Sequence, residues 1–548
     1  MVNFNCATRG SLAWIRVHIL RSNAFLLCRL RMATLRQHAK ELLRRFVRID
    51  AKNDRAIDTL AVDAGEQETL RHRSYSAIPG PKPMPLLGNT WRFLPYLGNF
   101  DIQTIDKLSR KLHAQYGDIV KIEGLLGRPD MVFVYDANEI ERIFRREEKM
   151  PHRPSMPSLD YYKHVLRKDF FQDNPGVIAV HGESWYNFRS KVQQVMLQPR
   201  TARMYISAIE EASVAFLRRI AKIRNHKSEV PDDFLNEMHK WSLESIARVA
   251  LDVRLGCLDD NADAETQGLI DALITFFKNV PVLELKIPFW KIFNTPTWKQ
   301  YVNALDTIVS TISKYTAAAL SRAENDVNSD KELSLLERVL AREGDTKVAS
   351  ILALDLFLVG VDTTSTSVAS VLYQLALHPE KQALAYEEIC NVLPQRDAPL
   401  EATNIDNLKY LRACIKETLR MYPVVIGNGR SMTSDTIISG YRVPKGVQVV
   451  FQHYVISNME KYFPRSCEFL PERWLRDDGI RHAFASLPFG YGRRMCLGRR
   501  FAELEMIIVI SKILQFYKVE YHHKRLEYYI NPMYTPKGPL KLRFIDRQ

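Results

Sequence analysis

Residues 489–498 read FGYGRRMCLG and run directly into a helical pattern that extends from Arg499 to Phe516. The two glycines before Cys496 permit a tight turn that brings backbone N–H groups close to the sulfur, and Gly498 lets the next helix approach a flat object. A cysteine at the start of a helix is expected to have a lowered pKa, and the thiolate is the form that ligates iron. The alternative interpretation is a buried free cysteine after a glycine-rich turn, which is the usual fate of a single cysteine.

This stretch fills every specified position of the pattern F-G-x-G-x-R-x-C-x-G, at Phe489, Gly490, Gly492, Arg494, Cys496 and Gly498. It resembles the haem-binding loop of the cytochrome P450 family. The resemblance implies a haem b cofactor that contacts Phe489 and Gly498. It also implies that Cys496 is the proximal thiolate ligand of the iron and that Arg494 is a partner of a haem propionate.

An E-x-x-R pattern at Glu417 and Arg420 places both side chains on one face of a helix. The same pattern at 41–44, 68–71 and 139–142 is interpreted as a surface ion pair worth about 0–1 kcal/mol. The pattern at Glu417 differs in position, because it precedes Cys496 by 79 residues with the sequence PERW at 471–474 between them. It resembles the family's E-x-x-R helix, which implies that Arg473 completes a buried triad with a structural role.

Trp185 and Arg189 lie one helical turn apart. Taken alone, they indicate an amphipathic helix with an ordinary buried tryptophan. The resemblance to the family's W-x-x-x-R helix implies instead that both side chains contact a haem propionate, and Arg430 resembles a third such contact. A ferric haem with a thiolate ligand has a net charge of about −2, so buried guanidinium groups are needed to bind it.

The sequence LFLVGVDTT at 356–364 lies within a long apolar helical pattern, where a glycine costs about 1 kcal/mol and a buried aspartate needs partners. One interpretation is a helix kink with a threonine bonded back to a carbonyl. The resemblance implies an oxygen-activation groove with broken helical hydrogen bonds, in which Asp362 and Thr363 relay protons. Val359 departs from the small residue that is usual in the family, and it puts the efficiency of oxygen activation in question.

The remaining sequence predicts a mainly α fold with a minor β-sheet region, which in this family is the cytochrome P450 fold, as one large domain over 79–548. A composition of 46% hydrophobic and 10% aromatic residues is that of a chain with a large core. Helical patterns cover 136–147, 182–197, 201–222, 231–252, 265–280, 299–322, 346–377, 379–393, 408–421 and 498–517. Strand patterns cover 116–122, 131–135, 448–451 and 540–544, and the turn at 127–130 joins the first two.

The charge is concentrated at the start of the chain. Residues 1–48 carry +9 of the net +14, because Glu41 is their only acidic residue. This Arg-rich, amphipathic segment predicts a mitochondrial transit peptide over 1–48, cleaved between 40 and 75, before a linker over 49–78. The alternatives are a basic arm for RNA or phospholipid and a membrane anchor, but arginines interrupt each apolar run before the ~18–20 residues of a span.

Arg412 and Lys416 lie at i and i+4 on the E-x-x-R helix. They resemble the ferredoxin-docking pair of the mitochondrial members of the family, and the alternative is a solvated basic stripe. The resemblance implies electrons from an adrenodoxin-like ferredoxin, which a ferredoxin reductase supplies. It also implies a location on the matrix side of the inner mitochondrial membrane. The segment 288–293 mixes aromatic and basic residues, which is consistent with peripheral contact with that membrane or with packing in the core.

The resulting hypothesis is a monooxygenase that uses O2 to hydroxylate a lipophilic substrate. The closest similarity is to insect mitochondrial members, so the substrate is expected to be a steroid such as an ecdysteroid, or a xenobiotic such as an insecticide. Expected substrate-facing stretches are 152–178, 273–298, 356–363 and 423–426.

The alternatives are a haem-thiolate isomerase or dehydratase without a redox partner, and a non-enzymatic basic membrane-binding or nucleic-acid-binding protein. No nucleic-acid recognition motif is present, so a nucleic-acid partner is not expected.

Overall fold

A 32-residue helix, α13 (Thr346–Leu377), passes through the core. Asp345 caps its N-terminus by accepting hydrogen bonds from the N–H groups of Lys347 at 2.9 Å and Val348 at 3.2 Å. The helix ends at Leu377, because Pro379 disfavours helical geometry at the residue before it, His378. It packs against α9 (Phe234–Leu251), α11 (Pro296–Asn325), α12 (Leu335–Glu343) and α18 (Arg499–Phe516). Among the described residues it is the one helix long and apolar enough to cross a bilayer, and burial in the core accounts for that composition.

The computed structural model describes residues 72–94, 97–154, 156–260, 263–325, 332–396, 398–475, 482–530 and 533–548. The predicted transit peptide and the predicted linker as far as residue 71 lie outside the described residues. The mainly α fold with minor sheets is confirmed, and Ser74–Gln548 form one compact unit.

The other helices are α2 (Ile105–Tyr116), α3 (Ala137–Arg145), α4 (Pro157–Tyr161), α5 (Lys168–Phe171), α6 (Gly182–Leu197), α7 (Pro199–Arg203), α8 (Ile206–Ile223), α10 (Ala264–Leu285), α14 (Pro379–Val392), α15 (Ala402–Asn407), α16 (Lys409–Met421) and α17 (His453–Ile456). Short 3₁₀ turns are η1 (Tyr75–Ala77), η2 (Thr90–Phe93), η3 (Ile102–Thr104), η5 (Phe289–Lys291), η6 (Pro471–Trp474) and η7 (Gly492–Arg494), and η4 (Tyr162–Leu166) is a π turn.

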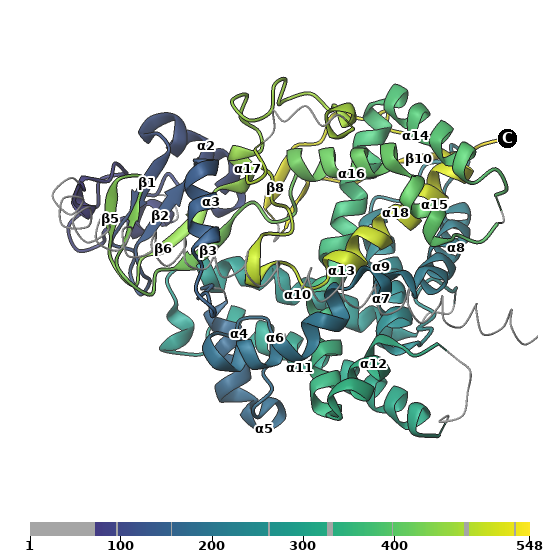
Figure 1. Cartoon of the computed structure of the whole chain (residues 1–548), viewed down its shortest axis with the longest axis horizontal. Helices are drawn as coiled ribbons and strands as arrows, with labels where there is room; N and C mark the ends of the chain where they lie inside the picture. The colour runs from purple at the N-terminus through teal and green to yellow at the C-terminus, as the bar shows by residue number, and fades with distance from the viewer. Residues whose placement is uncertain are drawn as a thin grey trace, which may run out of the picture. The chain divides into compact units, whose positions relative to one another are not determined.

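Four strands form the largest sheet in the order β1-β2-β6-β3, in which β2 and β6 are parallel and the other pairs antiparallel. These strands are β1 (Ile119–Ile122), β2 (Met131–Val134), β3 (Asn428–Ser431) and β6 (Gln448–Phe451). Two-stranded sheets pair β4 (Thr436–Ile438) with β5 (Tyr441–Val443), β7 (Tyr517–Glu520) with β10 (Arg543–Asp546), and β8 (Tyr528–Ile530) with β9 (Tyr534–Pro536). In Figure 1, β1, β2 and β6 lie on one side and α9, α13 and α18 on the other.

Three segments differ from the sequence-based expectation. The predicted helix over 201–222 is interrupted between α7 and α8. The helix predicted to end at 280 continues through Pro281 to Leu285, so a proline lies inside α10. The stretch 157–171 forms three short helical turns, and polar contacts fix it to three long helices. Ser158 donates to Glu284 of α10, Tyr162 to Asp306 of α11, and Lys163 to Asp355 of α13.

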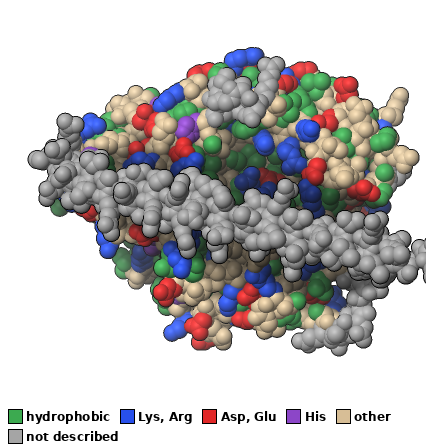
Figure 2. All heavy atoms as spheres, in the orientation of Figure 1, with side chains coloured by type: hydrophobic (Ala, Val, Ile, Leu, Met, Phe, Trp, Pro, Cys, Tyr) green, Lys and Arg blue, Asp and Glu red, His purple; other side chains and the backbone are tan. Residues whose placement is uncertain are grey.

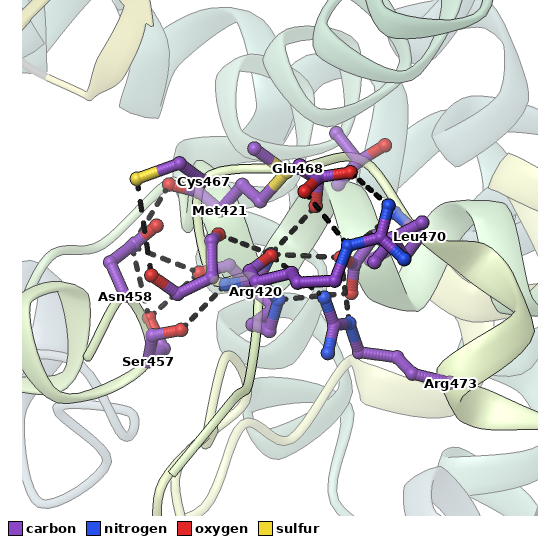
Figure 3. Close-up of polar contacts among 12 residues, drawn as sticks. Arg420, Met421, Ser457, Asn458, Cys467, Glu468, Leu470 and Arg473 are labelled. Atoms are coloured by element: carbon purple, nitrogen blue, oxygen red, sulfur yellow. Dashed lines mark hydrogen bonds and ion pairs between the residues drawn. The ribbon is translucent and has the colours of Figure 1, made fainter. Parts of the chain in front are cut away.

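A buried carboxylate on α16 fixes the chain that leads to the cysteine loop. Glu417 accepts hydrogen bonds from Arg420 at 2.8 and 2.9 Å, from Arg473 at 3.0 Å and from the Trp474 indole at 2.8 Å. Arg420 in turn donates to the carbonyl oxygens of Ser457 at 2.7 Å and Ser466 at 2.8 Å. Figure 3 shows Arg420 between Ser457 and Leu470, with Arg473 beside it. Residues 457–474 are thereby anchored to α16.

Replacing Glu417 by Ala should destabilise the protein by about 3–5 kcal/mol, because two arginines would lose their buried partner. The free energy of unfolding in urea, followed by far-ultraviolet circular dichroism, measures this effect. Glu139→Ala is the matched control, since Glu139 forms an E-x-x-R pair with the partly exposed Arg142 and should cost about 1 kcal/mol or less. Equal losses in the two variants would contradict the role given to Glu417.

Candidate functional site: a cysteine loop and a cluster of arginines

The cysteine loop turns at two glycines and enters α18 at Arg499. Gly490 and Gly492 have φ of +70° and +72°, a conformation that favours glycine, and the Cys496 N–H donates to the Phe489 carbonyl at 2.9 Å. A Cβ atom built on Gly498 would meet no atom within 4 Å. The loop therefore keeps an open side next to the cysteine.

The Cys496 thiol is accessible, yet burial raises its pKa. Cys496 is open to solvent and yet surrounded by protein atoms, so it lines a recess. The Gly498 N–H and the charges of Arg189, Arg153 and Arg499 act in the opposite direction but do not outweigh burial. The expected lowering of the thiol pKa at a helix start is therefore wrong for the protein alone. Coordination to a metal ion would deprotonate the thiol outright.

Four arginines from separate segments gather around this recess. Arg189 lies on α6, Arg430 on β3, Arg494 in η7 and Arg153 in the loop before α4. Burial lowers the pKa of Arg153 and of Arg189 to about 10, and burial together with the other three guanidinium groups lowers the pKa of Arg494 to about 9. All four remain charged at neutral pH. Glu147 is the carboxylate that pairs with Arg430, and it offsets only part of this charge.

Three of these guanidinium groups keep one buried N–H without a partner among the described residues: Nε of Arg189, Nη2 of Arg430 and Nη2 of Arg494. Other nitrogens of Arg189 and Arg494 donate to backbone carbonyls. Arg189 donates to the Met495 carbonyl at 3.1 Å, and Arg494 donates to the carbonyls of Pro151 and Val180, both at 2.9 Å. Since leaving buried donors of a charged group unpaired is costly, the cluster is built to receive an anion.

The aromatic residues of the site support the arginines. The Arg494 guanidinium lies 3.6 Å from the centre of the Trp185 ring, a cation–π contact on a buried indole. Trp185 thus contacts Arg494 directly. Phe489 is half-buried and lies 5.6 Å from the Arg499 guanidinium.

Sequence reasoning missed several residues of this cluster. They are Arg153, Glu147 and the two histidines His152 and His181, whose rings stack 4.2 Å apart. Burial and the nearby Arg494 lower the pKa of both histidines, that of His181 to about 3, so both are neutral at pH 7. No local pattern marks these residues, because only the tertiary fold brings them to Arg494.

The structure does not show the expected break in α13. The helix is continuous through 356–364, and the Thr363 hydroxyl donates to the Val359 carbonyl at 2.7 Å, as in the alternative interpretation. Asp362 is not bonded to Thr363 but faces His239 of α9. Gly360 serves packing, since a Cβ there would lie 2.7 Å from a side-chain carbon of Ile246 on α9.

Two of the expected substrate-facing aromatic residues belong to the core. Tyr162 and Phe171 are fully buried and form an edge-to-face pair. Phe170 is partly buried, and Tyr161 is partly exposed and packs edge-on against Trp290. Lys163 explains the ordering of this stretch, because its buried ammonium donates to the Pro175 and Ile178 carbonyls and to Asp355.

Comparison with known proteins gives a consistent result. The family model described as Cytochrome P450 matches residues 78–544. "Probable cytochrome P450 49a1" of Drosophila melanogaster is 48% identical over 490 residues, which cover 87% of this chain and 83% of the relative. "Probable cytochrome P450 301a1, mitochondrial" of the same species is 50% identical over 478 residues, 86% of each chain. "Cytochrome P450 CYP12A2" of Musca domestica is 36% identical over 507 residues, 88% of this chain and 93% of the relative.

The site fits the haem b of that family. Arg189, Arg430 and Arg494 present unpaired buried donors that suit two propionates, and the accessible Cys496 suits the iron. The open side of Gly498 leaves room for a flat ring beside the loop. The arginine donors, the accessible cysteine and the open side of Gly498 are all properties of this chain's own residues.

Arg189→Met should weaken retention of haem, because a charged hydrogen bond worth about 1.5–3 kcal/mol is lost. Haem should transfer to apomyoglobin roughly 10–100-fold faster than from the unaltered protein. Arg189→Lys, which keeps the charge, should fall between the two. Arg200→Met on the exposed surface of α7 is the matched control, and transfer from it as fast as from Arg189→Met would refute the assignment.

Proposed function

The chain belongs to the cytochrome P450 family of haem-thiolate monooxygenases, and from that premise we propose that it is a mitochondrial enzyme that hydroxylates a lipophilic substrate with electrons from a ferredoxin. The observation that carries the proposal is the cluster of buried arginines beside the accessible Cys496. The printed names of several relatives include the word mitochondrial, and the Arg-rich segment over 1–48 agrees with that location.

Each part of the site has a task in this reaction. Cys496 would hold the iron as a thiolate, and Arg189, Arg430 and Arg494 would hold the propionates. When bound, the haem supplies the chemistry by which O2, two electrons and two protons convert a C–H bond into C–OH and water. Asp362, whose pKa burial raises to about 7, holds a proton near neutral pH on the helix that passes through the core.

Docking of a ferredoxin is proposed at α16 and the start of α18, which pack against each other. Lys416, Arg493 and Arg500 are exposed there, and Arg412 is half-buried with one N–H on the Ile405 carbonyl at 3.2 Å. Arg493 lies within the cysteine loop and Arg500 follows Cys496 by four residues, so both are next to the place where an electron must arrive. On the face shown in Figure 2, Lys and Arg side chains are interspersed with Asp and Glu.

Peripheral contact with the inner membrane is proposed at an exposed apolar surface formed by the segment 288–293, next to the end of α10 and the turn after β1. Phe289, Ile292 and Phe293 are exposed, at 47%, 80% and 56%. The turn after β1 adjoins them, since Arg128 donates to the carbonyls of Leu283 and Lys286. Trp290 is buried against Trp298 instead, so the segment 288–293 combines core packing with an exposed apolar surface.

The spectrum of the reduced protein with carbon monoxide tests the haem-thiolate site. The unaltered protein should show the red-shifted band of a thiolate-ligated haem, and Cys496→Ser should lose that band because the thiolate is gone. A reduced protein without haem absorbance would rule the proposal out. Product formation from steroid and xenobiotic panels should require ferredoxin, and turnover without any redox partner would favour an isomerase or dehydratase.

Lys416→Glu should slow the first electron transfer from ferredoxin about ten-fold at low ionic strength, with less effect at high salt and none on haem content. Stopped-flow absorbance of the haem measures the rate. Lys278→Glu, on the exposed surface of α10, makes the same change of charge and should leave the rate unaltered. If both variants match the unaltered protein, the docking surface lies elsewhere.

A further inference from the structure

Asp362 of α13 faces a buried histidine of α9. His239 Nε2 lies 3.7 Å from Asp362 Oδ1, and the side chains are 6% and 15% exposed. The other carboxyl oxygen, Oδ2, is buried without a hydrogen-bond partner among the described residues. The close approach of the two helices at Gly360 brings these groups together. At 3.7 Å the contact is longer than a hydrogen bond and too short to admit a water between the two atoms.

The hydrogen bonds around His239 determine which ring nitrogen carries the proton. Ser365 Oγ lies 2.8 Å from the Val361 carbonyl oxygen and 2.7 Å from His239 Nδ1. A hydroxyl has one proton to donate, and the carbonyl can only accept it. When Ser365 donates to the Val361 carbonyl, it accepts from Nδ1–H, and this is the tautomer that we assign to the ring. In the neutral ring this leaves a lone pair on Nε2, directed at the carboxyl group of Asp362.

A lone pair on Nε2 favours a proton on Asp362, because a carboxylate would set two acceptors opposite each other. Burial lowers the pKa of His239 to about 4 and raises that of Asp362 to about 7, which favours a neutral ring beside a neutral acid. Burial is the cause in both cases. Other carboxyl groups lie on the packed helices. Burial raises the pKa of Glu505 of α18, which accepts from Ser245, to about 7, and Asp355 of α13 pairs with Lys163. The pair thus holds two protons, one on His239 Nδ1 and one on Asp362, and no net charge.

We propose that His239 is a positioning residue that holds Asp362 as the protonated acid, with the Oδ1–H group directed at Nε2, until the carboxyl group turns to deliver its proton. In that step the O–H bond breaks, the proton passes to a water or hydroxyl in the site, and the carboxylate takes a new proton from solvent. His239 keeps its single proton throughout. The inference rests on the proposed function for the use of this proton, but the pairing itself can be tested without turnover.

Infrared spectroscopy of the resting haem-loaded protein tests the pairing. At pH 6 the difference between the unaltered protein and Asp362→Asn should contain the C=O stretch of a carboxylic acid. In His239→Leu this band should move to higher wavenumber, because the acid loses its acceptor. His239→Gln should keep it near its original place, since the Gln amide oxygen accepts from the acid while its NH2 group donates to Ser365. Ser242→Ala, on the same helix, is the control that should leave the band unchanged, because the Ser242 hydroxyl has no hydrogen-bond partner among the described residues.

The fraction of electrons lost as hydrogen peroxide tests the use of the proton. In the unaltered protein this fraction should rise as the pH passes through about 7, where Asp362 loses its proton. In His239→Leu the rise should begin at lower pH, because the protonated acid is less well stabilised, and peroxide at pH 7 should increase several-fold. His239→Gln should restore the original profile.

Two results would overturn the inference: an unshifted carboxylic acid band in His239→Leu, or a His239→Gln variant that matches His239→Leu in both band and profile. The second result would show that the ring acts through packing and not as an acceptor. Absence of any ferredoxin-supported turnover would count against the proposed function alone, because the infrared band does not depend on it.

Discussion

The site depends on one electrostatic imbalance. Four guanidinium groups are gathered next to a cysteine, each repelling the others, with one carboxylate among them. Such an arrangement is stable only with an anion in place, because a buried charge without a partner costs several kcal/mol. The two propionates of a haem would satisfy that need, and Cys496 beside the arginines would hold its iron. Charge and coordination therefore select the same ligand independently.

The fold supplies this arrangement through two kinds of support. On the cysteine side, Glu417 and its arginines fix the irregular segment 457–474, so that the loop is presented from an anchored chain. On the other side, α13 supplies a buried apolar wall, and Lys163 ties the short turns at 157–171 to that wall through Asp355. In both supports, buried charged side chains with all of their hydrogen bonds made hold the backbone in place where regular secondary structure is absent.

Much of this could be predicted from the sequence. Helical periodicity located the long helices, and local motifs located Arg189, Arg430, Arg494 and Cys496, because within a motif spacing fixes geometry. Arg153, the stacked histidines and His239 were not predictable, since each reaches its partner from a distant segment and no pattern in the chain records the contact. The pKa of Cys496 was predicted in the wrong direction, because a helix start can be recognised in a sequence but the degree of burial cannot. The Thr363 hydroxyl donates to the carbonyl of Val359 and not to Asp362. Both acceptors are near it in the sequence, and the sequence does not determine which one it uses.

The four arginines also set the order of events when the chain matures. Arg153 and Arg494 lie at opposite ends of most of the domain's sequence, so the pocket for the cofactor does not exist until nearly all of the polypeptide has been made and folded around it. Capture of haem is then a late, post-translational step. The mutual repulsion of the arginines before that step leaves the cofactor-free chain less stable than the finished enzyme. The supply of haem would therefore limit how much of the protein survives in the cell, and not only how much of it is active.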